Sequence, residues 1–281
     1  MIRKAVIPAA GLGTRLLSAT KELPKEMLPI FYRDSNGEIY LKPMLQVLFE
    51  QLYKFGFREF CFIVGRGKRA VEDHFTPDYS FLDLLEKKGK EKFVKSLKEF
   101  YSMIEKSTIV WINQPEPLGF GHAVYLAKPF VRDETFLVAA GDTCIISNDF
   151  YHIRELIKKH SEGSVATLLA QEVDDPREYG VIITNDNNYV VKVIEKPKEI
   201  ISNLAVLPMY VFEPVIFNAI EATKQGYGNE IQLTDAIQKT IDWGLKVNYV
   251  TLSKNTIRLD IGTAFFYYDA LIKSYNNKIF E

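Results

Sequence analysis

The chain has 281 residues, of which 47% are hydrophobic and 25% are charged, so it is long enough for one large domain or two modest ones. Its 35 basic and 36 acidic residues leave a net charge of -1, which excludes a strong overall attraction to nucleic acid or to an anionic membrane. The only cysteines, Cys61 and Cys144, lie in apolar runs without metal-ligand spacing, and we expect buried free thiols.

No apolar run approaches the ~18 residues that a membrane span needs, and the run that follows Lys4 breaks at Pro8. We therefore expect a soluble, cytoplasmic protein without a signal peptide.

The first half of the chain alternates short apolar runs with amphipathic segments, which is typical of parallel βαβ units. The expected strands are 4–8, 59–64, 108–113 and 135–140, and the expected helices are 44–55, 68–74 and one that opens at Gly121. This order predicts an α/β fold with a doubly wound, Rossmann-like, mostly parallel sheet. Ligands bind such sheets at the carboxyl ends of the strands, where Gly11, Gln114 and Asp142 fall.

The second half predicts a smaller antiparallel subdomain. Its expected strands are 165–172, 181–184, 189–195, 204–212 and 245–252, and its expected helices are 215–222, 232–243 and a C-terminal helix within 263–281. A lysine-rich segment, 78–106, has a helical pattern and is predicted to be an inserted surface pair of helices. Because no flexible linker or internal repeat interrupts the chain, we expect one continuous domain over 1–281. Residues 165–260 are expected to form one side of this domain.

A glycine-rich loop follows the first strand. Gly11 and Gly13 lack Cβ atoms, so backbone N–H groups there can approach an anion closely, and Arg15 and Lys25 add positive charge. The nicotinamide dinucleotide fingerprint needs a third glycine where this chain has Leu16, and the Walker loop needs Gly-Lys-Ser/Thr. The spacing therefore argues against both of these phosphate-binding classes.

The stretch Ala9-Ala10-Gly11-Leu12-Gly13-Thr14-Arg15, with Pro24-Lys25-Glu26-Met27-Leu28-Pro29 after it, resembles the signature of bacterial-type UTP–glucose-1-phosphate uridylyltransferases. The resemblance continues along nearly the whole chain. It includes Gln114, Gly119-Phe120-Gly121-His122-Ala123-Val124, Gly141-Asp142, Tyr179-Gly180-Val181, Glu195-Lys196-Pro197, Ser202-Asn203-Leu204-Ala205, Glu230-Ile231-Gln232-Leu233-Thr234-Asp235-Ala236 and Asp260-Ile261-Gly262. It implies a GT-A-like nucleotidyltransferase fold, UTP and glucose 1-phosphate as substrates, and a homo-oligomer such as a tetramer.

The implied reaction is attack by a sugar 1-phosphate oxygen on the α-phosphorus of UTP. The attacking monoester has a second pKa near 6 and is mostly ionised at neutral pH, so no general base is required. Arg15 and Lys25 suit the triphosphate, and Lys196 suits the sugar phosphate. Asp142 and Asp260 are the candidate ligands of Mg²⁺, which prefers a few carboxylates together with phosphate oxygens and water.

The resemblance also implies a set of binding residues. The amide of Gln114 suits the imide edge of uracil or thymine, Glu26 is expected to contact the nucleotide or to brace the loop, and for His122 we favour a structural role. The nucleotide-binding set is Ala9, Ala10, Gly11, Gly13, Thr14, Glu26, Gln114, Gly119 and Asp142. Residues 165–260 are then the sugar-binding side, with Gly180, Glu195 and Asn203 as the sugar-binding set.

Two positions depart from the uridylyltransferase pattern. Ala264 stands where a lysine is usual, and Pro208-Met209 stands where a Gly-Arg pair is common. Gly262-Thr263 is closer to the related thymidylyltransferases, so dTTP or another sugar 1-phosphate stays an alternative. A regulatory relative that binds a nucleotide sugar without turnover is a second alternative, and a nicotinamide-dependent oxidoreductase is a third.

Overall fold

The computed structural model describes residues 2–33, 37–253 and 256–277. Within them, a nine-stranded sheet contains four adjacent parallel strands in the order β6-β1-β4-β5, with β5 at one edge of the sheet. These are β1 (Lys4–Pro8), β4 (Glu59–Gly65), β5 (Thr108–Gln114) and β6 (Phe136–Ala139). The parallel, Rossmann-like part of the fold predicted from the sequence is therefore present, with strand bounds that differ from the predicted ones by at most a residue at each end.

The antiparallel strands of the second half continue the same sheet. β11 pairs antiparallel with β6, β8 and β9, the β9–β10 hairpin lies at the edge, and β12 runs parallel to β8. Their bounds are β8 (Ala166–Glu172), β9 (Gly180–Thr184), β10 (Val190–Glu195), β11 (Leu204–Phe212) and β12 (Val247–Thr251). The reversal of strand direction at β11 separates the two halves of the sheet.

Helices cover both faces of the sheet because residues along each strand alternate between faces. In β1, Ala5 and Ile7 join a core cluster with one group of helices, and Val6 joins the cluster on the other face. The first group contains α1 (Met44–Phe55), α2 (Arg69–His74), α4 (Glu91–Glu105) and α7 (Tyr151–His160). The second contains α5 (Phe120–Leu126), α6 (Lys128–Val131), α8 (Val215–Glu221) and α9 (Leu233–Asp242).

Two small two-stranded sheets complete the fold. β2 (Pro29–Arg33) pairs with β3 (Ile39–Pro43), and β7 (Thr143–Ile146) pairs antiparallel with β13 (Ile257–Asp260). The last helix, α10 (Ala264–Asn276), packs on β2 and β13 and buries Ala270 between them. The predicted C-terminal helix is thus present, while residues 278–281 lie outside the described part of the chain.

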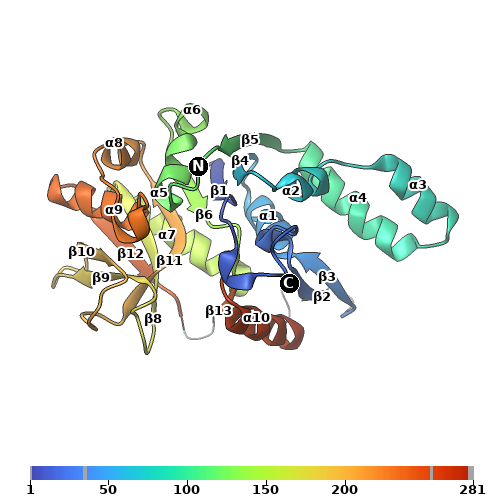
Figure 1. Cartoon of the computed structure of the whole chain (residues 1–281). Helices are drawn as coiled ribbons and strands as arrows, with labels where there is room; N and C mark the ends of the chain where they lie inside the picture. Colours follow the sequence, from blue (N-terminus) through green and yellow to red (C-terminus); the bar gives the residue numbers. More distant parts are fainter. Residues whose placement is uncertain (1, 34–36, 254–255, 278–281) are drawn as a thin grey trace.

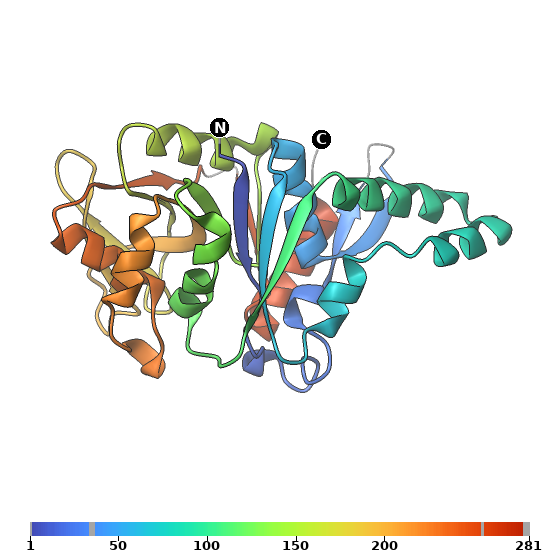
Figure 2. The ribbon, with the colours of Figure 1, turned by 90° about the horizontal axis from the view of Figure 1, so that it is seen from above.

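The segment 78–106 forms α3 (Tyr79–Lys87) and α4, which run beside each other and project from the rest of the chain (Figures 1 and 2). The base of this arm is anchored by aromatic packing: the ring of Phe100 lies 6.1 Å from that of Phe49 on α1 and 5.4 Å from that of Phe75. In the described residues, no helix is long and apolar enough to cross a membrane.

Replacing Phe100 by alanine tests this anchor. Phe100 is fully buried, and large-to-small changes at such positions cost ~3–5 kcal/mol, so we expect the free energy of unfolding to fall by about that amount. Phe93→Ala on the same helix is the control, because Phe93 is 51% exposed and its loss should cost under ~1 kcal/mol. Urea-induced unfolding of the two variants measures both values, and equal losses would contradict the packing described here.

Candidate active site

One cavity of about 880 Å³ opens at the carboxyl ends of the parallel strands, next to the antiparallel half of the sheet. In Figure 2 the loops after β1 and β5 leave the sheet at this same end. The cavity is lined by fourteen of the residues predicted from the sequence: Ala10, Gly11, Gly13, Thr14, Arg15, Lys25, Glu26, Gln114, Gly119, Asp142, Gly180, Glu195, Lys196 and Asp260. Residues spread over most of the chain thus meet in one place.

Two predicted residues do not line this cavity. Ala9 is buried, and its backbone N–H donates to the carbonyl of Ile63 at 2.8 Å, so that N–H is engaged within the sheet. Asn203 is exposed at the start of β11, where its carbonyl accepts from the N–H of Val173 at 3.0 Å.

The glycine-rich loop places its cations at the centre of the cavity. Lys25, in a short 3-10 turn, makes an ion pair with Asp142, which follows β6. The Cε of Lys25 would lie 3.5 Å from a Cβ built on Gly11, so this lysine lies directly against the loop. The guanidinium of Arg15 reaches Gly262, at the end of β13.

The pairing of β7 with β13 brings the two predicted metal ligands together. Asp260 is in register with Thr143, the neighbour of Asp142, and the N–H of Ile261 donates to the carbonyl of Asp142 at 3.1 Å. Burial acts against charge on Asp142, but the Lys25 ammonium outweighs it and holds the pKa of that carboxyl below its usual range. Burial, together with the nearby Asp142, raises the pKa of Asp260.

These two carboxyl groups suit a divalent cation. Asp142 lies close enough to Asp260 to oppose its ionisation, and a cation bound to both would remove that repulsion. The described residues contain no cluster of three or more His, Cys, Asp or Glu side chains that could hold a metal. A site with two carboxylates fits Mg²⁺, which completes its coordination with phosphate oxygens and water.

A buried ion pair behind the loop was not predicted from the sequence. Glu26 is 1% exposed and accepts a hydrogen bond from the Nζ of Lys68 at 2.7 Å, and Lys68 is itself 7% exposed. Burial raises the pKa of Glu26, and Lys68 and Lys25 act in the opposite direction. This ion pair ties Glu26, which also lines the cavity, to the segment that follows β4. The sequence feature that could have indicated Lys68 is a basic residue just after a predicted strand, in Gly65-Arg66-Gly67-Lys68.

Gly180, Glu195 and Lys196, predicted from the sequence to contact the sugar 1-phosphate, line one side of the cavity. Glu195 accepts from the hydroxyl of Thr234 at 2.8 Å, and burial raises its pKa. A Cβ on Gly180 would lie 2.7 Å from Thr234 Cγ2 and 3.1 Å from Glu195 Oε2, so only glycine fits there. The ammonium of Lys196 lies 5.1 Å from the centre of the Tyr227 ring, within the range of a cation–π contact.

Tyr179 and Arg258 join this side of the cavity to the candidate metal ligands, although neither was assigned a role from the sequence. Arg258 stands two residues before Asp260 on β13, so both side chains point to one face of that strand. Its guanidinium donates to the hydroxyl of Tyr179 at 2.8 Å, and the carbonyl of Tyr179 accepts from the N–H of Lys196 at 3.0 Å.

Comparison with known proteins agrees with this geometry. The family model described as nucleotidyl transferase matches residues 4–276. A UTP–glucose-1-phosphate uridylyltransferase of Pseudomonas aeruginosa is 36% identical over 99% of this chain and 97% of its own length, and one of Staphylococcus epidermidis is 40% identical over 85% and 81%. The chain belongs to the nucleotidyl transferase family.

The fold of this nucleotidyl transferase is also close to that of solved relatives. A crystal structure of a UDP-glucose pyrophosphorylase in complex with UDP-glucose superposes with a TM-score of 0.79, at 30% identity, over 98% of this chain and 99% of the other. The family resemblance and the α/β fold class predicted from the sequence are therefore confirmed.

The two departures from the uridylyltransferase pattern have local structural explanations in this nucleotidyl transferase. Thr263 caps α10, because its hydroxyl accepts from the N–H of Phe266 at 3.2 Å, and Ala264 is the exposed first residue of that helix. Pro208 lies at an irregularity in the pairing of β11 with β8, where proline is tolerated, and lines the cavity. Met209 packs into the core.

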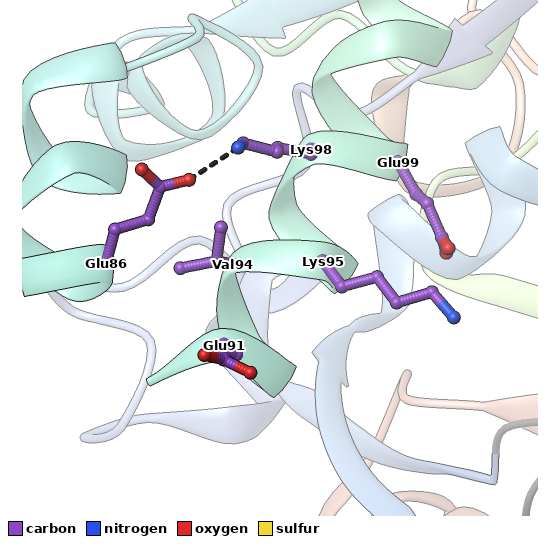
Figure 3. Close-up of a pocket in the computed structure, with 6 residues that line it drawn as sticks. All are labelled: Glu86, Glu91, Val94, Lys95, Lys98 and Glu99. Atoms are coloured by element: carbon purple, nitrogen blue, oxygen red, sulfur yellow. Dashed lines mark hydrogen bonds and ion pairs between the residues drawn. The ribbon is translucent and has the colours of Figure 1, made fainter. Parts of the chain in front are cut away.

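A second hollow, of about 520 Å³, lies between α3 and α4 (Figure 3). Acidic and basic side chains alternate around it, and Lys98 and Glu86 pair across it. It is lined by Glu86, Glu91, Val94, Lys95, Lys98 and Glu99. Exposed and of mixed charge, it lacks the glycine-rich backbone and gathered cations that a nucleotide requires, so we place the reaction in the larger cavity.

Removing one member of the buried Lys68–Glu26 pair should be costly. Lys68→Met leaves a buried carboxylate without its partner, and we expect the free energy of unfolding to fall by ~3–5 kcal/mol. Adding Glu26→Gln should recover most of that loss because the uncompensated charge is gone. Lys98→Met, which breaks an exposed pair, should cost under ~1 kcal/mol. Urea-induced unfolding measures all three, and a small loss in Lys68→Met would show that the pair does not hold the loop.

Proposed function

We propose that this protein transfers the uridylyl group of UTP to glucose 1-phosphate, giving UDP-glucose and pyrophosphate. The observation that carries this proposal is that a single cavity joins Gln114, the Asp142–Asp260 pair and Lys196. These are a base-recognising amide, a candidate metal site and a cation for a second phosphate. The relatives named as uridylyltransferases, and the likeness to a pyrophosphorylase solved with UDP-glucose, support the choice of substrates.

The reaction is an in-line attack by a phosphate oxygen of the sugar on the α-phosphorus, without a covalent intermediate. The nucleophile is already anionic at neutral pH, so the protein must position two polyanions and neutralise their charge. Lys25 lies against the glycine-rich loop and Arg15 reaches Gly262, and both line the cavity, where they would bind the triphosphate and the departing pyrophosphate. Lys196 would hold the sugar phosphate opposite the bond that breaks.

Asp142 and Asp260 would hold Mg²⁺, which supplies charge neutralisation at the phosphate oxygens. On the sugar side, Glu195 would accept hydrogen bonds from sugar hydroxyl groups, and Gly180, which lines the cavity beside it, allows Thr234 to pack against Glu195. We leave Asn203 out of this subsite because it is exposed and does not line the cavity. Homo-oligomerisation and a cytoplasmic location stay predictions from the sequence.

A thymidylyltransferase activity is the second candidate, because Gly262-Thr263 follows Asp260 and Thr263 lines the cavity. Thymine presents the same imide edge as uracil, so an amide at Gln114 does not separate the two bases.

A substrate panel tests the proposed function directly. UTP, dTTP, CTP and ATP are each combined with glucose 1-phosphate and other sugar 1-phosphates, and pyrophosphate release is followed with Mg²⁺ and with EDTA. We expect the highest kcat/KM with UTP and glucose 1-phosphate, and loss of turnover in EDTA. A higher kcat/KM with dTTP would favour the second candidate. Absence of turnover in every combination would exclude a nucleotidyltransferase activity.

Variants at the centre of the cavity test the residue roles. We expect Lys196→Ala and Asp142→Asn each to lower kcat by about 100-fold or more, as the loss of a charge that acts on the transition state does. Lys198→Ala is a matched control, because Lys198 is exposed two residues from Lys196 and does not line the cavity. Circular dichroism checks that each variant is folded, and near-normal rates in folded Lys196→Ala or Asp142→Asn would remove that residue from the mechanism.

A further inference from the structure

The side chain of Gln114 is enclosed at the end of β5, where it lines the cavity and is only 6% exposed. Its amide nitrogen contacts two acceptors. The Nε2 atom lies 3.2 Å from the carbonyl oxygen of Gly119 and 3.0 Å from the Nδ1 of His122. Because a carbonyl oxygen can only accept, the atom that faces Gly119 must be the NH₂ group and not the oxygen.

The first acceptor is held rigidly. Gly119 has φ +107, and a Cβ there would lie 2.7 Å from the Cβ of Glu230 and 2.8 Å from the carbonyl oxygen of Ile231, so the backbone is closely packed. Backbone hydrogen bonds on both sides, from Ile231 to Leu118 at 2.8 Å and from Gly121 to Ile231 at 2.9 Å, fix this loop.

The second acceptor is also fixed, because His122 lies in the first turn of α5. His122 accepts at Nδ1 only as a neutral imidazole with its proton on Nε2. Burial lowers its pKa, although the carboxylate of Glu116 acts in the opposite direction, so the neutral form prevails at neutral pH. His122 does not line the cavity and lies behind Gln114.

Both N–H groups of the Gln114 amide are therefore engaged, and its Oε1 accepts no hydrogen bond from any described residue. A fixed acceptor facing the base favours a ring N–H, which uracil and thymine carry at N3. Cytosine has an unprotonated nitrogen at N3, so its N3 and the Gln114 Oε1 would both be acceptors and could not form a hydrogen bond. A Gln114 amide that could rotate freely would also be able to point its NH₂ group toward the base, and that orientation would suit cytosine.

We propose that His122 is a positioning residue that sets the base selectivity of this site by locking the Gln114 amide with its oxygen toward the base. The proposal rests on the proposed function in one respect, that the cavity binds a pyrimidine nucleoside triphosphate. His122 acts through Gln114 and does not itself contact the substrate.

The test compares UTP with CTP, using dissociation constants from calorimetry and kcat/KM with glucose 1-phosphate. In His122→Phe the acceptor is lost, and we expect the preference for UTP over CTP to fall about tenfold, the factor expected for one hydrogen bond. His122→Asn should keep the preference within about threefold, because its Oδ1 stands the same number of bonds from the backbone as Nδ1. Tyr125→Phe loses one hydrogen bond, to Glu221, on the same helix and should leave the preference unchanged.

Combination with Gln114→Ala separates positioning from a general structural role. If His122 acts through the amide, His122→Phe should not change the preference further in a Gln114→Ala background. An unchanged preference in His122→Phe alone, or an equal fall in both backgrounds, would overturn the proposal. Wild-type protein that binds UTP and CTP equally would also overturn it. Discrimination in binding without turnover of glucose 1-phosphate would instead reject the proposed function and leave the role of His122 standing.

Discussion

The ion pair between Lys25 and Asp142 joins the loop after β1 to the loop after β6. It is the inner part of a larger arrangement of buried charge, since Lys68 holds Glu26 beside Lys25, and Asp260 lies beside Asp142. Charges are costly to bury, and they persist here because Asp142 and Glu26 are each paired with a lysine, while Lys25 and Arg258 lie near Asp260. The glycine-rich loop, the parallel sheet and the β7–β13 pair all serve to keep this arrangement in one place.

The position of these buried charges is also related to the change in strand direction at β11. The parallel strands deliver the loops with Lys25, Gln114 and Asp142 to one edge, as expected for such sheets. The antiparallel strands then bring Lys196 and Glu195 to face them from the side, and the Arg258–Tyr179 hydrogen bond connects the two groups. The cavity is thus lined from two sides by elements that belong to different halves of the sheet.

The sequence was informative where function is carried by a local pattern. Alternating strands and helices predicted the parallel half of the sheet, and the short motifs around Gly11, Gln114 and Lys196 gave residues that line the cavity. The β2–β3 hairpin and α7 were not predicted, although α7 has an amphipathic pattern that buries Ile153 and Leu156 on one face.

Lys68 and Arg258 were missed for a different reason. Their importance depends on partners 42 and 79 residues away, which no spacing along the chain reveals. His122 lies within a recognised motif, but only the structure shows that its ring faces Gln114.

One short segment, residues 231–234 at the start of α9, contacts residues at two ends of the cavity. Ile231 holds the backbone around Gly119 that binds the Gln114 amide, and three residues later Thr234 packs on Gly180 and donates to Glu195. Both ends of the cavity therefore pack against the same short stretch, where α9 begins. This segment links the loop around Gly119 to Gly180 and Glu195, so the two parts of the cavity are held by one stretch of chain and not by two independent loops.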